Sequence, residues 1–191
     1  VKSPTAGTLT NIDTEKGSVT IEYQFKEKKK YANLYGKVLN TKNNTAVTIN
    51  YNGYKIQGII GFGKENHGII HFISDELQTD NLKNKIVISS SKIDKDLLQK
   101  LINEKVAGLI TPSIDNSVIT KHIDKEIGIA LTGRENIAFP IIITEGFGNF
   151  NMRKEYQEFL KNSHGKFCYM NPHTQIRAGV TRPTIIIQEI R

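Results

Sequence analysis

Thr144 and Glu145 are the side chains best placed for chemistry, because they follow the apolar run Phe139-Pro-Ile-Ile-Ile and lead into Gly-Phe-Gly148. Ligands of α/β proteins bind at the carboxyl ends of the strands, and glycine lets a backbone approach a ligand closely. We therefore predict a ligand loop in which Thr144 and the N–H groups of Gly146 and Gly148 donate hydrogen bonds, while Glu145 accepts them or acts as a base. The alternative is a tight strand-to-helix connection in which the glycines supply positive φ and Glu145 caps a helix or pairs with an arginine.

Two further apolar runs also end in hydroxyl side chains, namely Lys85-Ile-Val-Ile-Ser-Ser-Ser91 and Ala107-Gly-Leu-Ile-Thr-Pro-Ser113. The carboxyl ends of neighbouring parallel strands meet at one edge of a sheet. We therefore expect the three ends to converge and Ser113 to join the predicted ligand site.

Three arginines are candidates for binding an anion, because a guanidinium forms bidentate hydrogen bonds with carboxylate or phosphate. Arg134 lies in Thr-Gly-Arg, with Glu135 beside it as a simpler partner, and Arg177 and Arg182 flank Gly179. The alternative for Arg177 and Arg182 is a place at an interface or on the surface.

Neither a catalytic residue nor a metal or cofactor site is predicted. Cys168 lies between aromatic residues in an expected strand, so a buried inert thiol is favoured over a nucleophile activated by His164 or His173. His67 and His71 are four residues apart, which is metal-ligand spacing on a helix, but their segment reads as a strand.

The elements that position these residues change character near residue 80. Before it, alternation such as Ser18-Val-Thr-Ile-Glu-Tyr-Gln-Phe25 indicates half-buried strands, and Asn52-Gly53 predicts a type I′ hairpin turn. After it, residues 85–111 read as a β-α-β unit, with the apolar positions from 93 to 106 at helical spacing. Further helices are expected near 117–125 and 152–160, and strands near 139–144, 166–170 and 184–190. The sequence thus predicts an α+β chain in which residues 1–80 form an all-β domain and residues 81–191 form an α/β domain.

The segment Ser3-Pro-Thr-Ala-Gly-Thr-Leu9 resembles the opening of biotinyl/lipoyl-type barrel-sandwich domains. It departs from the carriers of that type, because neither Met-Lys-Met nor Asp-Lys-Ala occurs in the chain. The resemblance therefore implies a non-carrier relative, a barrel-sandwich hybrid used for docking.

The whole chain also resembles a group of uncharacterised bacterial proteins, through Gly58-Ile-Ile-Gly-Phe-Gly-Lys-Glu-Asn-His-Gly68, Thr144-Glu-Gly-Phe-Gly148 and Thr174-Gln-Ile-Arg-Ala-Gly-Val-Thr-Arg-Pro183. This resemblance implies a barrel-sandwich start, a central α/β domain and a further small β-barrel beyond residue 191. We expect the α/β domain to be of the swivelling type. It implies no activity, and it suggests a piece of a longer protein.

Composition narrows the class of protein. The 191 residues, 38% of them hydrophobic, suffice for a core, and no apolar run reaches the roughly 18–20 residues of a membrane span. A lone cysteine excludes an intrachain disulfide and favours a reducing, cytoplasmic location. The formal charge of +7 is biased toward the second half, where all the arginines lie, so a phosphate-rich partner such as nucleic acid is a third class to weigh.

The function expected first is a non-enzymatic interaction or scaffold module that binds a protein partner or the rest of a longer chain. The alternative is a small-ligand or anion-binding α/β domain, with or without catalysis, using Ser113, Arg134, Thr144 and Glu145. The second alternative is nucleic-acid binding through the basic C-terminal domain.

Overall fold

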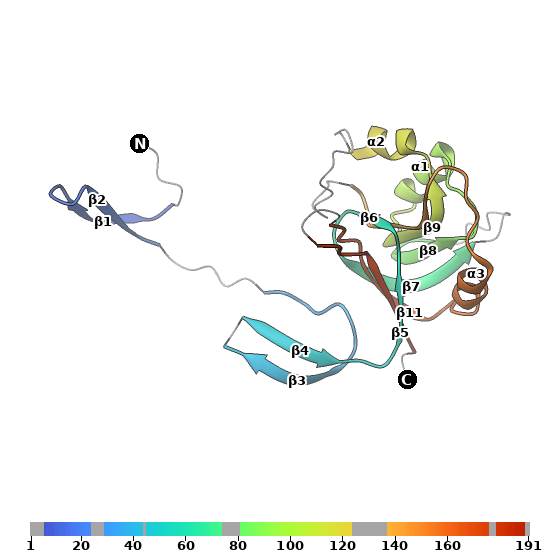
Figure 1. Cartoon of the computed structure of the whole chain (residues 1–191), viewed down its shortest axis with the longest axis horizontal. Coiled ribbons are helices and arrows are strands. Elements are labelled where there is room, and N and C mark those ends of the chain that lie inside the picture. The colour runs from blue at the N-terminus through green and yellow to red at the C-terminus, as the bar shows by residue number, and fades with distance from the viewer. Residues whose placement is uncertain are drawn as a thin grey trace. The chain divides into compact units, whose positions relative to one another are not determined.

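The computed structural model describes residues 6–23, 29–43, 45–73, 81–123, 137–175 and 179–189. Over these ranges the chain is a mixed α+β protein, with many strands and few helices (Figure 1). It divides into two compact units, Val1–Ala32 and Asn33–Arg191.

The first unit contains one antiparallel hairpin, formed by β1 (Thr8–Asp13) and β2 (Ser18–Glu22). The side chain of Asp13 accepts hydrogen bonds from the N–H groups of Glu15 and Lys16, at 3.1 and 3.0 Å, and Gly17 supplies the positive φ of 62°. A short polar side chain that binds the following backbone, together with a glycine, is a common way to reverse the chain. This local chemistry fixes the hairpin.

The second unit begins with a similar hairpin, formed by β3 (Lys37–Lys42) and β4 (Ala46–Asn50). Its base is attached to the rest of the unit through Gln188, whose amide accepts from Tyr35 N–H at 2.9 Å and donates to Tyr35 O at 2.8 Å and to Asn52 O at 3.2 Å. Leu34 and Tyr51 also pack against a small apolar cluster at this base.

The second unit is built on an eight-stranded sheet with the strand order β5-β12-β11-β7-β8-β9-β10-β6. The pairs β7–β8, β8–β9 and β9–β10 are parallel, and the other four pairs are antiparallel. The strands are β5 (Tyr54–Gln57), β6 (Ile60–Phe62), β7 (Asn66–Ile73), β8 (Lys85–Ser89), β9 (Gly108–Ile114), β10 (Ile141–Phe147), β11 (Phe167–Asn171) and β12 (Thr184–Gln188).

The sheet closes on itself, because β5 and β6 are two parts of one extended segment, residues 54–62. Gly58 N–H donates to Pro183 O at 2.9 Å, beside β12, and Ile59 N–H donates to Ile143 O in β10 at 2.8 Å. The segment therefore joins the two ends of the strand order, as in a barrel. A Cβ on Gly58 would lie 3.0 Å from Ile143 O, so glycine suits this close crossing.

Three helices accompany the strands: α1 (Lys95–Asn103), α2 (Asn116–Ile123) and α3 (Lys154–Lys161). The expected helix of the β-α-β unit is confirmed as α1. Its N-cap is Asp94, whose carboxylate accepts from Leu97 N–H at 2.8 Å and so satisfies one of the free donors of the first turn.

Alternating side chains of the strands build an apolar core on each side of the sheet. One cluster joins Val87 and Leu109 to Leu98 and Leu101 of α1 and Ile119 of α2. The other joins the alternate residues of the strands to α3 and the segment before it, and its central members are Ile86, Ile88, Ile110, Ile142, Met152, Leu160 and Met170. Each fully buried aliphatic side chain contributes roughly 1.5–3 kcal/mol relative to an exposed one, so these two layers hold the sheet together.

The domain boundary differs from the one expected near residue 80. β5, β6 and β7 precede that position, yet they pair with β12, β10, β11 and β8, and the compact units divide after Ala32 instead. The expected hairpin at Asn52-Gly53 is also wrong, because this turn leads from β4 into β5, which pairs with β12. The alternation of apolar residues that indicates a strand carries no information about which strand is its neighbour. Asn-Gly is likewise a local signal, and it does not determine whether the strands before and after it pair with each other.

Candidate functional site

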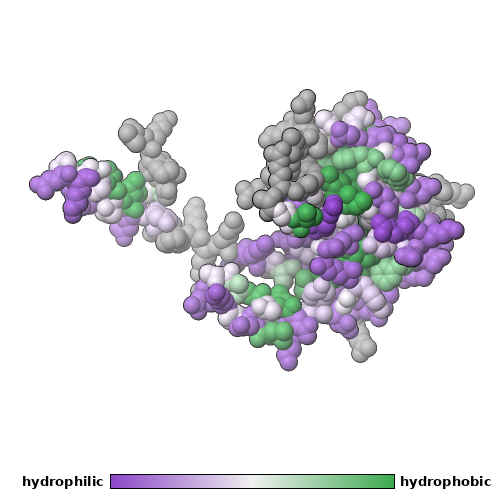
Figure 2. Space-filling model, in the orientation of Figure 1, coloured by the Kyte–Doolittle hydropathy of each residue, from purple (hydrophilic) through white to green (hydrophobic). Residues whose placement is uncertain are grey.

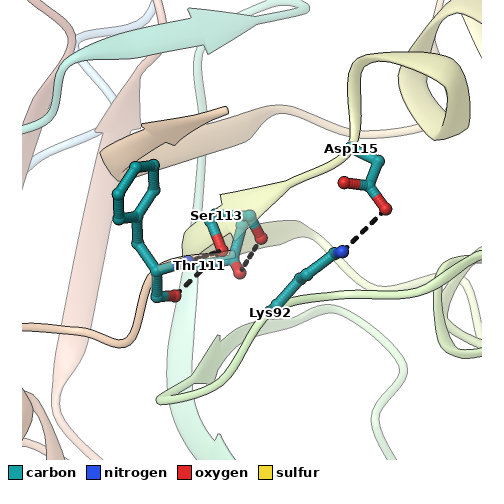
Figure 3. A network of polar contacts seen from close by, with 5 residues as sticks. Lys92, Thr111, Ser113 and Asp115 are labelled. Atoms are coloured by element: carbon teal, nitrogen blue, oxygen red, sulfur yellow. Dashed lines mark hydrogen bonds and ion pairs between the residues drawn. The ribbon is translucent and has the colours of Figure 1, made fainter. Parts of the chain in front are cut away.

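The hydroxyl-bearing ends of β8, β9 and β10 lie at one edge of the sheet, since the three strands are adjacent and parallel. Four buried hydroxyl side chains belong to these strands: Ser89 and Ser113 lie at the ends of β8 and β9, and Thr111 and Thr144 lie in the middle of β9 and β10. Thr111 Oγ1 lies 3.0 Å from Ser113 O and 3.4 Å from Ser91 O, which links the ends of β9 and β8. Figure 3 shows the Thr111 and Ser113 part of this network, with the partly exposed ion pair between Lys92 and Asp115 beside it.

Ser113 fastens the loop that follows β10. Its Oγ donates to Phe150 O at 2.9 Å and accepts from Phe150 N–H at 3.1 Å (Figure 3). The hydroxyl thus uses its proton and one lone pair on the backbone of a single residue. This places Ser113 in the expected cluster, but in a structural role.

Thr144 differs from its neighbours. Its side chain is fully buried, and its Oγ1 has no hydrogen-bond partner among the residues that the structure describes. The pairing of β10 with β9 shifts register between Ile143 and Gly146, so Thr144 lies in an irregular stretch of the strand. Burying a hydroxyl without a partner costs about 1–3 kcal/mol, which marks this position as unusual.

Glu145 is paired with an arginine, as the alternative interpretation of this loop predicted. The guanidinium of Arg153 donates from Nε to Oε1 and from Nη2 to Oε2 of Glu145, both at 3.1 Å. The same guanidinium lies 4.4 Å from the centre of the Tyr156 ring. These contacts raise the pKa of Arg153, chiefly through the hydrogen bond to Glu145. The carboxylate therefore ties the start of α3 to β10.

Gly146 and Gly148 have the positive φ values that the alternative also predicted, 137° and 122°. The expected loop begins later than predicted, because β10 continues through Gly146 to Phe147 and only Gly148 lies in the connection that follows. Two partly exposed aromatic side chains lie here, Phe147 at the end of β10 and Phe150 in the connection after it. The Phe147 ring lies 6.3 Å from that of Phe62 in β6, centre to centre, so the loop leans on the closing segment of the sheet.

The arginine candidates are not gathered around Glu145 in the described part of the chain. Arg182 donates from Nη1 to Ile59 O at 2.9 Å and so secures the crossing between β5 and β6. Arg134 and Arg177 lie outside the described residues.

Three hollows in the described part of the second unit lie away from the carboxyl ends of β8, β9 and β10. A cavity of about 280 Å³ is lined by apolar side chains of α1 and α2 together with residues 137–139 and Ile141. A hollow of about 160 Å³ lies beside Glu65, and a shallow one of about 550 Å³ lies at the base of the β3–β4 hairpin. Among the described residues that line these three hollows, Ser113, Thr144 and Glu145 do not occur.

Cys168 is fully buried, and burial raises the pKa of its thiol, so the thiolate needed for nucleophilic attack is disfavoured. The described ranges contain no group of three or more metal-binding side chains. His71 instead lies beside His164, with ring centres 5.0 Å apart, and His164 Nδ1 accepts from Phe72 N–H at 3.2 Å.

The two hairpins carry a different kind of candidate surface. In the first, the register places Leu9 opposite Ile21 and Ile12 opposite Val19, so these four apolar side chains share one face. Leu9, Ile12 and Val19 are 52–59% exposed.

The second hairpin repeats this arrangement, with Val38 opposite Ile49 and Thr41 opposite Val47 on one face. Val38 and Val47 are 54% and 57% exposed. Figure 2 shows apolar residues at the surface of both hairpins. We call the faces of Leu9, Ile12, Val19 and Ile21 and of Val38, Thr41, Val47 and Ile49 the apolar hairpin faces.

Comparison with known proteins gives no relative: no family model, no curated protein and no solved structure matches the chain. Among the helices of the described residues, none has the length and apolar character needed to cross a membrane.

Proposed function

We propose that this chain is a non-enzymatic interaction or scaffold module, and that the apolar hairpin faces are its contact surfaces. The observation that carries the proposal is the exposure of Leu9, Val19, Val38 and Val47 on strands whose opposite faces are mostly polar. Contiguous exposed apolar residues bordered by polar ones are typical of sites that bind other proteins. A two-stranded hairpin is also marginally stable in water unless a partner covers it.

The contacts at the strand ends support a structural role for the residues that suggested chemistry. Ser113 is engaged by the backbone of Phe150, and Glu145 by Arg153. The side chains that could act as donors and as base thus hold a loop and a helix in place.

For the finer architecture we propose a barrel-sandwich type for the N-terminal strands and a swivelling type for the α/β part, as in the proteins that the sequence resembles. The amphipathic hairpins support the first, because the sheets of a sandwich present one apolar face each. The single buried Cys168 supports a reducing, cytoplasmic location.

A photo-crosslinking amino acid placed at position 47 or position 48 of the whole chain tests the contact surface in living cells. The side chains of Val47 and Thr48 are adjacent in β4 and lie on opposite faces, so position 48 is a matched control. We expect protein adducts from position 47 and few from position 48. Equal adducts from the two positions, or none from position 47, would contradict the proposal.

Small-ligand binding remains a second candidate because of Thr144, whose buried hydroxyl has no partner in the described part of the chain. A thermal-shift screen against nucleotides, phosphorylated metabolites, carboxylates and divalent metals tests it, since a ligand that binds only the folded state raises the melting temperature. A saturable shift that Thr144→Val abolishes would favour ligand binding. A shift that this variant retains would place the ligand elsewhere.

A further inference from the structure

The connection between β4 and β5 contains Asn52-Gly53, which is the one Asn-Gly dipeptide in the sequence. Both residues are exposed. In such a dipeptide the main-chain nitrogen of the glycine can attack the side-chain amide of the asparagine, because no Cβ on the glycine hinders the close approach. The connection therefore holds a pair of groups with which the chain can modify itself.

The fold requires glycine at position 53. A Cβ there would lie 2.6 Å from Ile187 O and 3.1 Å from the side chain of Gln188. Because Ile187 O is a backbone atom of β12, it cannot move aside without disturbing the sheet, and a larger residue is excluded. The packing against β12 therefore fixes the residue type that reacts most readily after an asparagine.

The reacting groups of Asn52 and Gly53 are not engaged, whereas the carbonyl between them is. Neither the side-chain amide of Asn52 nor the N–H group of Gly53 makes a hydrogen bond to the described residues. Asn52 O, in contrast, accepts from Nε2 of Gln188 at 3.2 Å. Gln188 is only 3% exposed, and its amide also binds both backbone groups of Tyr35. The donor to Asn52 O is therefore held in place and shielded from water.

This hydrogen bond acts on the peptide group that must react. Loss of the proton from Gly53 N places negative charge on the nitrogen and, by resonance, on Asn52 O. A donor that already points at this oxygen stabilises the charge as it develops, and hydrogen bonds to charged acceptors are roughly twice as strong as neutral ones. Gln188 therefore favours ionisation of the nitrogen and promotes its attack.

We propose that Asn52 is a site of self-modification, at which the folded chain converts the side-chain amide into a carboxylate with water as the co-reactant. Gly53 N gives its proton to solvent and forms a bond to Cγ of Asn52, the Cγ–Nδ2 bond breaks, and ammonia leaves. Water then opens the cyclic imide, at the side-chain carbonyl to give aspartate or at the main-chain carbonyl to give isoaspartate. Nothing is oxidised or reduced, and the residue gains a negative charge.

The isoaspartyl product changes how the β3–β4 hairpin is held. In this product the main chain runs through Cβ and Cγ of residue 52, and the former main-chain carbonyl, to which Gln188 donates, becomes a carboxylate beside the chain. The hydrogen bond from Gln188 then no longer fixes the connection from β4 to β5. Self-modification therefore releases one attachment of the hairpin. It goes beyond the proposed function, because it needs no partner.

Incubation of the whole chain in mildly alkaline buffer, native or unfolded in guanidinium chloride, tests the proposal. Peptide mapping by mass spectrometry follows residue 52. Asn50 is the matched control within the same chain, because it is also exposed but precedes Tyr51, whose Cβ hinders the attack. We expect residue 52 to convert in the native chain at least as fast as in the unfolded chain, while Asn50 stays intact. Slower conversion in the native chain would overturn the proposal, because the fold would then protect the dipeptide.

Gln188→Met tests the hydrogen bond separately from the dipeptide. Methionine has a side chain of similar length but cannot donate to Asn52 O. Conversion in the folded variant should be about tenfold slower than in the wild type, since a lost hydrogen bond to a developing charge corresponds to about that factor in rate. An equal or faster rate in a variant that circular dichroism shows to be folded would contradict the role of Gln188. If the variant does not fold, the comparison of native and unfolded wild type still decides the proposal.

Discussion

The contrast between Ser113 and Thr144 gives the sharpest test of how the strand ends work. Both hydroxyls are fully buried, but Ser113 Oγ makes two hydrogen bonds to Phe150 and Thr144 Oγ1 makes none to the described residues. Removing the first hydroxyl should therefore destabilise the fold, and removing the second should not.

The magnitudes follow from the contacts. A net contribution of about 1 kcal/mol per hydrogen bond gives a loss of about 2 kcal/mol in the free energy of unfolding for Ser113→Ala, or about 4–8 °C in melting temperature for a chain of this size. Thr144→Val replaces an unpartnered buried hydroxyl by a methyl group of similar shape. We expect this variant to be between neutral and about 2 kcal/mol more stable than the wild type.

Urea unfolding gives the free energy of unfolding of both variants and of the wild type by linear extrapolation. Far-UV circular dichroism follows the transition, because the chain contains no tryptophan for fluorescence. The slopes should be unchanged, since neither substitution alters the surface that unfolding exposes. A loss of more than about 1 kcal/mol in Thr144→Val would refute the reasoning, because it would show that the hydroxyl has a stabilising partner such as a bound ligand or water.

Three further predictions concern the closed sheet and its buried groups. Gly61→Ala should cost about 2–3 kcal/mol because its Cβ would collide with the backbone of Pro172, whereas Gly179→Ala, with open space and a φ of 114°, should cost about 1 kcal/mol in the same urea assay. Burial and neighbouring basic side chains lower the pKa of His71 below 6.5, so the unfolded chain binds the proton more readily than the folded chain. The free energy of unfolding should therefore decrease as the pH falls below about 6.5. His71→Gln should reduce this decrease, and an unchanged dependence of stability on pH in the variant would contradict the prediction. The buried Cys168 thiol should react with a thiol reagent in urea but not in the native chain, and rapid native labelling would show that its strand opens.

The sequence predicted individual helices and strands, but it did not predict which strands pair with each other. The helical spacing around Leu98 and Leu101 predicted α1, and the alternation through Val19 and Ile21 predicted a strand, because both signals come from nearby residues. The pairing of β5 with β12 depends on residues far apart in the chain, and no local pattern records it.

The candidate site shows the same division. Apolar runs that end in hydroxyls predicted that Thr111, Ser113 and Thr144 lie at strand ends. The structure places Ser113 next to the last residue of β9, but Thr111 and Thr144 lie in the middle of β9 and β10, because these strands continue to Ile114 and Phe147. The interaction of Ser113 with Phe150 uses backbone atoms, which every residue carries, so the sequence offered no signal for it. The sequence predicted that Glu145 could pair with an arginine, but it did not identify which one, and in the structure the partner is Arg153.

The closing segment of the sheet also constrains how the chain is made. Residues 54–62 are synthesised early, but their hydrogen-bonding neighbours in β10 and β12 emerge much later, and β12 ends at Gln188. Pairings between strands this distant in sequence slow folding, because closing the long intervening loop costs conformational entropy before the stabilising contacts form. On the ribosome, β6 therefore lacks its neighbour until β10 has been made, and β5 lacks its neighbour until β12 has been made, and during this interval the unpaired strand edges are exposed to misassociation.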